Sequence, residues 1–162
     1  MKRTIAIVAG GDSSELVVSL RSAQGLYSFI DKERYNLYIV EMEGHRWEVV
    51  LPDGSKTPID RNDFSFMENG EKKHFDFAYI TIHGTPGENG ILQGYFDLLG
   101  IPYSSCNVLV SAMTFNKFTC NQYLKGFGIR VAESLILRKG FEITDEEVEA
   151  ATYARGSQDM PD

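Results

Sequence analysis

The fold is decided by the stretch His83-Gly84-Thr85-Pro86-Gly87-Glu88-Asn89-Gly90-Ile91-Leu92-Gln93-Gly94. It follows an apolar run typical of a strand, residues 75–82, and precedes a segment with helical periodicity, residues 91–99. Glycines allow the backbone to turn sharply and to approach a ligand closely, and the amides at a helix start attract anions. A histidine at the carboxyl end of a strand lies where open α/β sheets bind ligands. The stretch therefore predicts a binding loop between a strand and a helix.

The residues of this loop leave two interpretations open. In the structural one, the glycines only form turns, His83 is a buried histidine with its hydrogen bonds satisfied, and Glu88 caps a helix. In the functional one, His83 and the loop backbone contact a ligand. The functional interpretation is favoured, because four glycines beside a histidine at a strand end are a poor way to build only a turn.

Strand-like and helix-like segments alternate along the first hundred residues. The expected strands are residues 4–8, 35–42, 75–82 and, at an edge, 44–51, and the expected helices are residues 16–27 and 91–99. Such alternation predicts an α/β fold, an open parallel sheet with helices on both faces. Residues 55–74 are polar without a clear period, so we interpret them as a long loop or insertion.

The character of the sequence changes after residue 105. Residues 107–114 and 116–125 have the pattern of two helices, residues 130–137 alternate as a strand would, and a capping box at Thr144 predicts a further helix. We therefore expect one domain over residues 1–105 and the truncated beginning of a second over residues 106–150. The tail, residues 151–162, has no apolar period and is predicted to be disordered.

Two further patches carry candidate functional residues. A glycine turn, Gly10-Gly11, is followed by hydroxyls and by Glu15 at a helix start, where an anion or a positioned carboxylate would fit. Glu15 could equally complement the helix dipole. Lys117 lies in the first turn of an expected helix and opposes its dipole, which makes sense if a phosphate lies nearby. A lysine that is only solvated is the alternative.

Composition narrows the classes of partner. The net charge of −7 argues against nucleic acid or an anionic membrane as the main partner. No apolar run has the length of a membrane-spanning helix, and the N-terminal run, residues 5–9, is too short for a signal peptide, so we expect a cytoplasmic protein. Cys106 and Cys120 lack the spacing of metal ligands and are interpreted as buried thiols.

Taken together, the three patches resemble the D-alanine–D-alanine ligases of the ATP-grasp superfamily, over roughly residues 3–150. The matching segments are Gly10-Gly11 with Ser13-Ser14-Glu15, residues 18–23, His83-Gly84 to Gln93-Gly94, and Ala112-Met113 to Lys117. The resemblance implies that residues 1–105 form a Rossmann-like, pre-ATP-grasp domain that binds substrate. Residues 106–150 would then begin the central ATP-grasp domain.

The resemblance also implies an activity. Such enzymes join two D-alanines with ATP, through an acyl-phosphate on the first D-alanine, and the product feeds peptidoglycan synthesis for the cell wall. Glu15 would act in catalysis and substrate binding as a buried carboxylate that anchors the ammonium of the first D-alanine. Val18 would line the same pocket, and His83 and the Gly84 backbone would lie against the first D-alanine and its carboxylate. Lys117 would reach a phosphate of ATP.

The sequence departs from the family pattern at a few places. Asn89 and Asn116 stand where aspartate is common, and the second change alters the expected helix cap. The family's enzyme is roughly twice as long, and its later domains carry most adenine contacts and the carboxylates for magnesium. We therefore expect an N-terminal part that is inactive alone, with no metal ligands of its own, and a homodimer as its state of association.

Two alternatives remain beside the ligase interpretation. The chain could be a non-catalytic dimerisation or regulatory module derived from the ligase. It could also be a flavodoxin-like or other doubly wound domain that binds a different small ligand, which the alternation of strands and helices supports and the spacing of the histidine loop does not.

Overall fold

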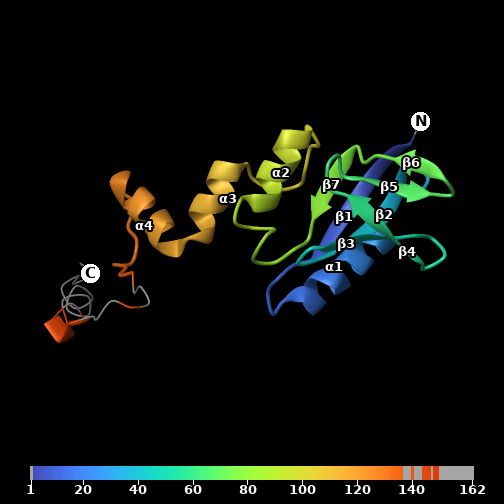
Figure 1. The fold of residues 1–162 in the computed structure, drawn as a ribbon. Coiled ribbons are helices and arrows are strands. Elements are labelled where there is room, and N and C mark those ends of the chain that lie inside the picture. The colour runs from blue at the N-terminus through green and yellow to red at the C-terminus, as the bar shows by residue number, and fades with distance from the viewer. Residues whose placement is uncertain (1, 137–139, 141–143, 147, 150–162) are drawn as a thin grey trace. The chain divides into compact units, whose positions relative to one another are not determined.

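A computed structural model describes residues 2–136, 140, 144–146 and 148–149 (Figure 1). The chain divides into two compact units, Met1–Phe115 and Asn116–Asp162, called here the first and the second unit. The strands are β1 (Arg3–Gly10), β2 (Tyr35–Glu43), β3 (Arg46–Val50), β4 (Lys56–Asp60), β5 (Ser65–Glu68), β6 (Glu71–Lys73) and β7 (Phe77–Ile80). The helices are α1 (Leu16–Phe29), α2 (Ile91–Leu99), α3 (Val108–Phe115) and α4 (Lys117–Gly126).

The strands of the first unit form one sheet in the order β6-β5-β4-β3-β2-β1-β7. β1 pairs in parallel with β2 and with β7, so that Val8 lies beside Val40 on one side and Ile80 on the other. The remaining pairs, from β2 outward to β6, are antiparallel. The predicted α/β class is confirmed, and the sheet is mixed, with its parallel part at the β7 end.

Helices cover both faces of the sheet, as predicted. Successive strand residues point to opposite faces, and in β1 Ile7 packs in a cluster with Ala23 of α1. Its neighbour Val8 belongs to the other cluster, which includes Phe96 of α2. A buried strand between two layers of helix explains why β1 is a continuous apolar run rather than an alternating one.

The expectation of a long loop over residues 55–74 is wrong. These residues form the antiparallel strands β4, β5 and β6, which continue the sheet, so β3 is an interior strand and not an edge. Each of the three strands has at most five residues, which is too short for a period to stand out. Ile59 and Phe66 are paired across β4 and β5 and are buried in the core, which fixes the register.

The helices expected after residue 105 are confirmed as α3 and α4, whereas the strand expected over residues 130–137 is not. Residues 130–136 have no regular structure, and residue 137 lies outside the described residues. A strand needs a partner, and the described part of the second unit contains no other strand.

The remaining expectations about the second half have mixed outcomes. The amide of Val148 donates to the carbonyl of Thr144, and the described residues from 145 to 149 are helical, as the capping box predicts. The tail, residues 151–162, lies outside the described residues. The boundary expected after residue 105 stays a prediction, and α3 belongs to the first unit. Cys106 is exposed and Cys120 half-buried, so the expectation of two buried thiols is wrong.

Candidate functional site

The candidate site forms where the carboxyl ends of β1 and β7 meet, because these two strands are parallel neighbours. Asp12 N–H donates to the carbonyl of Thr85 at 3.0 Å, and the Ser13 hydroxyl donates to the carbonyl of His83 at 2.9 Å. The same Ser13 oxygen accepts the amide of Glu15 at 3.2 Å. Ser13 therefore joins the start of α1 to the loop after β7, and Glu15 and His83 lie on either side of one hydroxyl.

The turn after β1 requires glycine. Gly11 has a φ of +100°, and a Cβ built there would lie 2.5 Å from Cγ2 of Ile82 and 3.2 Å from the carbonyl oxygen of Thr85. A side chain would therefore push the β1 turn away from the loop that follows β7. The glycine allows the close approach that makes the hydrogen bonds between the two loops possible.

The histidine loop is closed by its own glutamate. A carboxylate oxygen of Glu88 accepts the amide of Gly84 at 2.7 Å, and the amide of Glu88 donates to the carbonyl of Gly84 at 2.9 Å. Glu88 is therefore part of the loop. The structural interpretation assumed that Glu88 caps α2, and it does not. The N-cap of α2 is Gly90, which makes no side-chain capping bond, and Asn89 accepts the amide of Ile91 at 3.3 Å.

Sequence reasoning gave no role to Ser19, which the structure places beneath the site. Its side chain is fully buried, and its hydroxyl accepts the amide of Gly10 at 2.9 Å and lies 3.4 Å from the hydroxyl of Thr81. Ser19 thus holds α1 against the end of β1. The signal was present in the sequence, because Ser19 lies on the same helical face as Leu16 and Ala23.

The predicted site residues of the first unit are more open than expected. Glu15 was predicted to be a buried carboxylate, but its side chain is exposed and has no hydrogen-bond partner within the described part of the chain. Val18 is 53% exposed, whereas His83 and Gly84 are half-buried. Ser19 and Ala23 are the buried residues of α1, and Val18 lies on a different face of the helix. Glu15 lies on the side of Ser19, but it precedes the helix as its N-cap and is exposed there.

A small pocket lies beside this corner. It measures about 110 Å³ and is lined by Gly10, Leu16, Leu20, Met42 and the charged side chains of β2 and β3. Neither Glu15 nor His83 belongs to its lining. The predicted site residues therefore form an open corner on the first unit, and not the wall of an enclosed cavity.

Lys117 belongs to the second unit, whereas Glu15 and His83 belong to the first. It is the first residue of α4 and is exposed. The side chain of Asn116 accepts the amide of Thr119 at 3.0 Å and caps this helix, so asparagine provides the cap that the family pattern assigns to aspartate.

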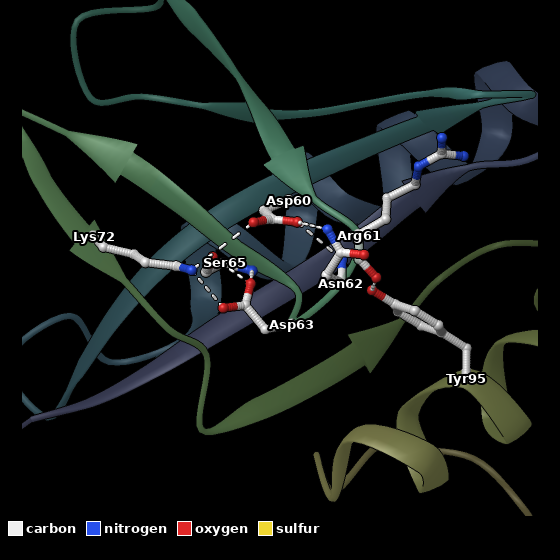
Figure 2. A network of polar contacts seen from close by, with 7 residues as sticks. All are labelled: Asp60, Arg61, Asn62, Asp63, Ser65, Lys72 and Tyr95. Carbon is white, nitrogen blue, oxygen red and sulfur yellow. Dashed lines mark hydrogen bonds and ion pairs between the residues drawn. The ribbon is translucent and has the colours of Figure 1, made fainter.

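A polar network on the far part of the sheet is structural (Figure 2). Lys72 of β6 forms an ion pair with Asp63 at 2.6 Å, and Ser65 also donates to Asp63. The hydrogen bonds from Lys72 and Ser65 lower the pKa of Asp63 to about 2. The Tyr95 hydroxyl of α2 donates to the carbonyl of Arg61 at 2.8 Å, and burial, with the nearby aspartates, raises the pKa of Tyr95 to about 12. The network attaches the β4–β5 turn to α2.

The described residues also bear on metal binding and on membrane insertion. Within residues 2–136 and the described positions after them, no three His, Cys, Asp or Glu side chains are grouped as a metal ion would require. No helix among the residues that the structure describes is long and apolar enough to cross a membrane.

Comparison with known proteins identifies the family. The family profile described as "D-ala D-ala ligase N-terminus" matches residues 4–106, which include both loops of the candidate site. The chain belongs to the D-alanine–D-alanine ligase family. It is 99% identical over 148 residues to the D-alanine–D-alanine ligase of Phocaeicola vulgatus, a match that covers 91% of this chain and 46% of that ligase.

Solved structures of this family have the same fold. D-alanyl-alanine synthetase A from Vibrio cholerae superposes with a TM-score of 0.77 at 31% identity, over 96% of this chain and 45% of that one. The D-alanine–D-alanine ligase of Bacillus anthracis complexed with ATP superposes with a TM-score of 0.70 at 27% identity, over 93% of this chain and 43% of that one. The chain thus spans about half the length of the relatives that it matches.

Proposed function

We propose that the chain supplies the D-alanine-binding corner of a D-alanine–D-alanine ligase. The observation that carries the proposal is the Ser13 hydroxyl, which joins the turn of Glu15 to the loop of His83 and Gly84. These bonds hold the backbone of Glu15 and the backbone of the histidine loop at one open corner of the first unit. A zwitterionic amino acid needs a carboxylate for its ammonium and donors for its carboxylate.

In this proposal each residue has one task. Glu15 anchors the ammonium of the first D-alanine, and Val18, exposed on the same turn of α1, contacts its methyl group. His83 and the Gly84 backbone lie against its carboxylate. The family name supports the reaction that joins two D-alanines, and the ATP-bound relative supports ATP as the second substrate.

The complete reaction requires more than the described residues. A carboxylate oxygen of the first D-alanine would attack the terminal phosphorus of ATP and release ADP. The amine of the second D-alanine would then attack the acyl carbon and release phosphate. Lys117 would contact an ATP phosphate in that process. We place this chemistry in the cytoplasm and assign its product to peptidoglycan synthesis, and we expect the chain alone to be inactive, because it spans 46% of its relative.

Binding of D-alanine to the purified chain tests the proposal. Titration with D-alanine, followed by nuclear magnetic resonance, is expected to shift signals of Glu15, Val18, His83 and Gly84, whereas L-alanine should shift them far less. Glu15→Gln should weaken binding about 10- to 100-fold, because a hydrogen bond to a charged group contributes about 1.5–3 kcal/mol. Glu71→Gln, on the exposed edge strand β6, is the matched control and should bind normally.

A second measurement concerns activity. Release of phosphate from ATP in the presence of D-alanine should be absent for the chain alone.

D-alanine binding that is lost in Glu15→Gln and kept in Glu71→Gln would support the assignment of the corner. Equal shifts with both alanine enantiomers, or none with either, would refute it.

Exposed apolar side chains favour a second candidate, a dimerisation or regulatory module. Leu109 of α3 is 71% exposed and Leu98 of α2 is 87% exposed, and a contiguous apolar patch that includes such side chains would mark a surface for another chain. This candidate predicts a homodimer, or a complex with the intact ligase, in sedimentation experiments. A monomer at every concentration that also fails to bind the Phocaeicola vulgatus ligase would exclude it.

A further inference from the structure

One buried side chain next to the histidine loop is not used by the proposed function. Gln93 lies on α2 and is fully buried. Its Nε2 donates to the carbonyl of Gly87 at 2.6 Å and to the hydroxyl of Ser105 at 2.8 Å. Its Oε1 is buried and has no hydrogen-bond partner among the described residues. Both amide protons of Gln93 are therefore donated to segments that flank α2.

Stability alone gives a poor account of this glutamine. An unsatisfied buried polar atom costs about 1–3 kcal/mol, while an ordinary hydrogen bond contributes about 0.5–1.5 kcal/mol. The two bonds of Nε2 are therefore largely offset by the unpaired Oε1. A methionine would fill a similar volume without burying an unpaired oxygen. What the glutamine adds is position, because its donors hold the carbonyl of Gly87 and the hydroxyl of Ser105 at defined places.

The first of these segments is the histidine loop. The backbone of Gly87 also lies close to Ile82, two residues after β7, since a Cβ built at Gly87 would lie 2.5 Å from the carbonyl oxygen of Ile82. Glu88 follows directly and holds the amide of Gly84. Gln93 thus holds the loop at Gly87, the residue directly before Glu88, which closes the loop.

The second segment leads into α3. The Ser105 hydroxyl, besides accepting from Gln93, donates to the carbonyl of Cys106, which also accepts the hydroxyl of Ser111 in α3. α3 in turn packs closely on α2, because a Cβ at Gly90 would lie 3.0 Å from the carbonyl oxygen of Val108. One side chain therefore sets the loop and the start of α3 relative to the same helix.

We propose that Gln93 is a positioning residue that holds the backbone of His83 and Gly84 in place for the first D-alanine. The proposal rests on the proposed function for the identity of the ligand. The positioning itself does not depend on the proposed function, because it concerns hydrogen bonds within the first unit. The two parts can therefore be measured separately on the purified chain.

Gln93→Met is the decisive variant, because it removes both Nε2 bonds and keeps the volume. We expect the amide of Glu88 to exchange with deuterium at least about ten times faster, since a lost bond of about 1.4 kcal/mol is a factor of ten. The dissociation constant for D-alanine should rise by a similar factor. The thermal midpoint should stay within a few degrees of wild type, and the exchange of β1 amides should not change.

Ser105→Ala is the matched control. It removes one partner of Nε2 and keeps the bond to Gly87, so the exchange of the Glu88 amide and the affinity for D-alanine should stay near wild type. Unchanged exchange of the loop amides in Gln93→Met would overturn the proposal. Unfolding of Gln93→Met would also overturn it, because the residue would then act through stability. So would an unchanged affinity for D-alanine in a variant whose loop amides exchange faster. If the wild-type chain does not bind D-alanine, the proposed function fails, and the exchange result alone decides whether Gln93 holds the loop.

Discussion

The two units of the chain differ in what they do with their apolar side chains. In the first unit the β1 residues Ala6 to Ala9 are completely buried, and two clusters of side chains fill the two faces of the sheet. In the second unit α4 buries none of its residues, and Phe127, directly after it, is 69% exposed. Both units contain aromatic and aliphatic residues, so composition does not explain the difference.

The difference shows that an apolar side chain is buried only where a second layer exists. The sheet of the first unit presents two faces, and each receives a helix. The described part of the second unit offers α4 a tilted aromatic contact between Tyr123 and Phe127, with ring centroids 5.0 Å apart, and no sheet. Short helices without such a layer are marginal in water.

The largest effect is expected at Gly10 of β1. It has a φ of +104°, and a Cβ there would lie 2.2 Å from the carbonyl oxygen of Met42, a backbone atom that cannot move aside cheaply. Gly10→Ala should therefore destabilise the first unit by more than about 3 kcal/mol, the range of severe mutations. Gly126→Ala, where no atom lies within 4 Å, should leave it unchanged. Denaturant unfolding of both variants measures the difference, and equal stability would contradict the packing described at β1.

A matched pair of phenylalanines gives the next largest effect. Phe96 of α2 is fully buried against Phe64, with ring centroids 4.9 Å apart, whereas Phe127 is mostly exposed. Phe96→Ala should cost about 3–5 kcal/mol of unfolding free energy. Phe127→Ala should stay within about 0.5 kcal/mol, as surface substitutions do. Similar losses in urea unfolding would mean that the second unit has a packed core of its own.

The sequence was most informative where a physical requirement is local. The loop over residues 83–94 was predicted because glycines, a histidine and the flanking periods all lie within one stretch, and the structure places it at the carboxyl end of β7. The continuous apolar run of β1 predicted a strand between two layers. The short strands β4 to β6 were missed, because their pairing depends on residues in neighbouring turns and their length hides the period.

The candidate site was predicted in part. His83 and Gly84 lie on the predicted loop, and Ser13 joins them to Glu15. The exposure of Glu15 could not be predicted from helical spacing, because Glu15 lies four residues before Ser19 on the side of α1 that is buried further along, and is exposed as the N-cap at the end of the helix. The bonds of Gln93 could not be predicted either, since they join α2 to segments before and after it in the chain.

A smaller effect is expected at the helix caps. Asn116 caps α4 through its side chain, whereas Glu15, the N-cap of α1, makes no side-chain capping bond. Asn116→Ala should weaken α4 by about 1 kcal/mol, which deuterium exchange of the α4 amides would detect, and leave unfolding of the first unit unchanged. Glu15→Ala should not increase exchange in α1. A loss of stability in the first unit on Asn116→Ala would contradict the assignment of α4 to a separate unit.

The smallest effect is expected from two ion pairs, one in each unit. Lys72 lowers the pKa of Asp63 to about 2, below its usual value of 3.8. A carboxyl with a lowered pKa in the folded state contributes stability that is present above pH 3.8 and is lost as the pH falls toward about 2. Asp63→Asn should therefore lower the unfolding free energy of the first unit slightly at pH 6, and the difference from wild type should vanish near pH 2.

Glu133→Gln removes the partner of Lys125, at 2.5 Å in the second unit, and should change the unfolding free energy of the first unit at neither pH. Chemical unfolding at a series of pH values, fitted for both variants and the wild type, measures this contrast. If the Asp63→Asn difference were the same at every pH, its cause would be lost packing or a lost hydrogen bond to Ser65, and the ion pair with Lys72 would contribute nothing.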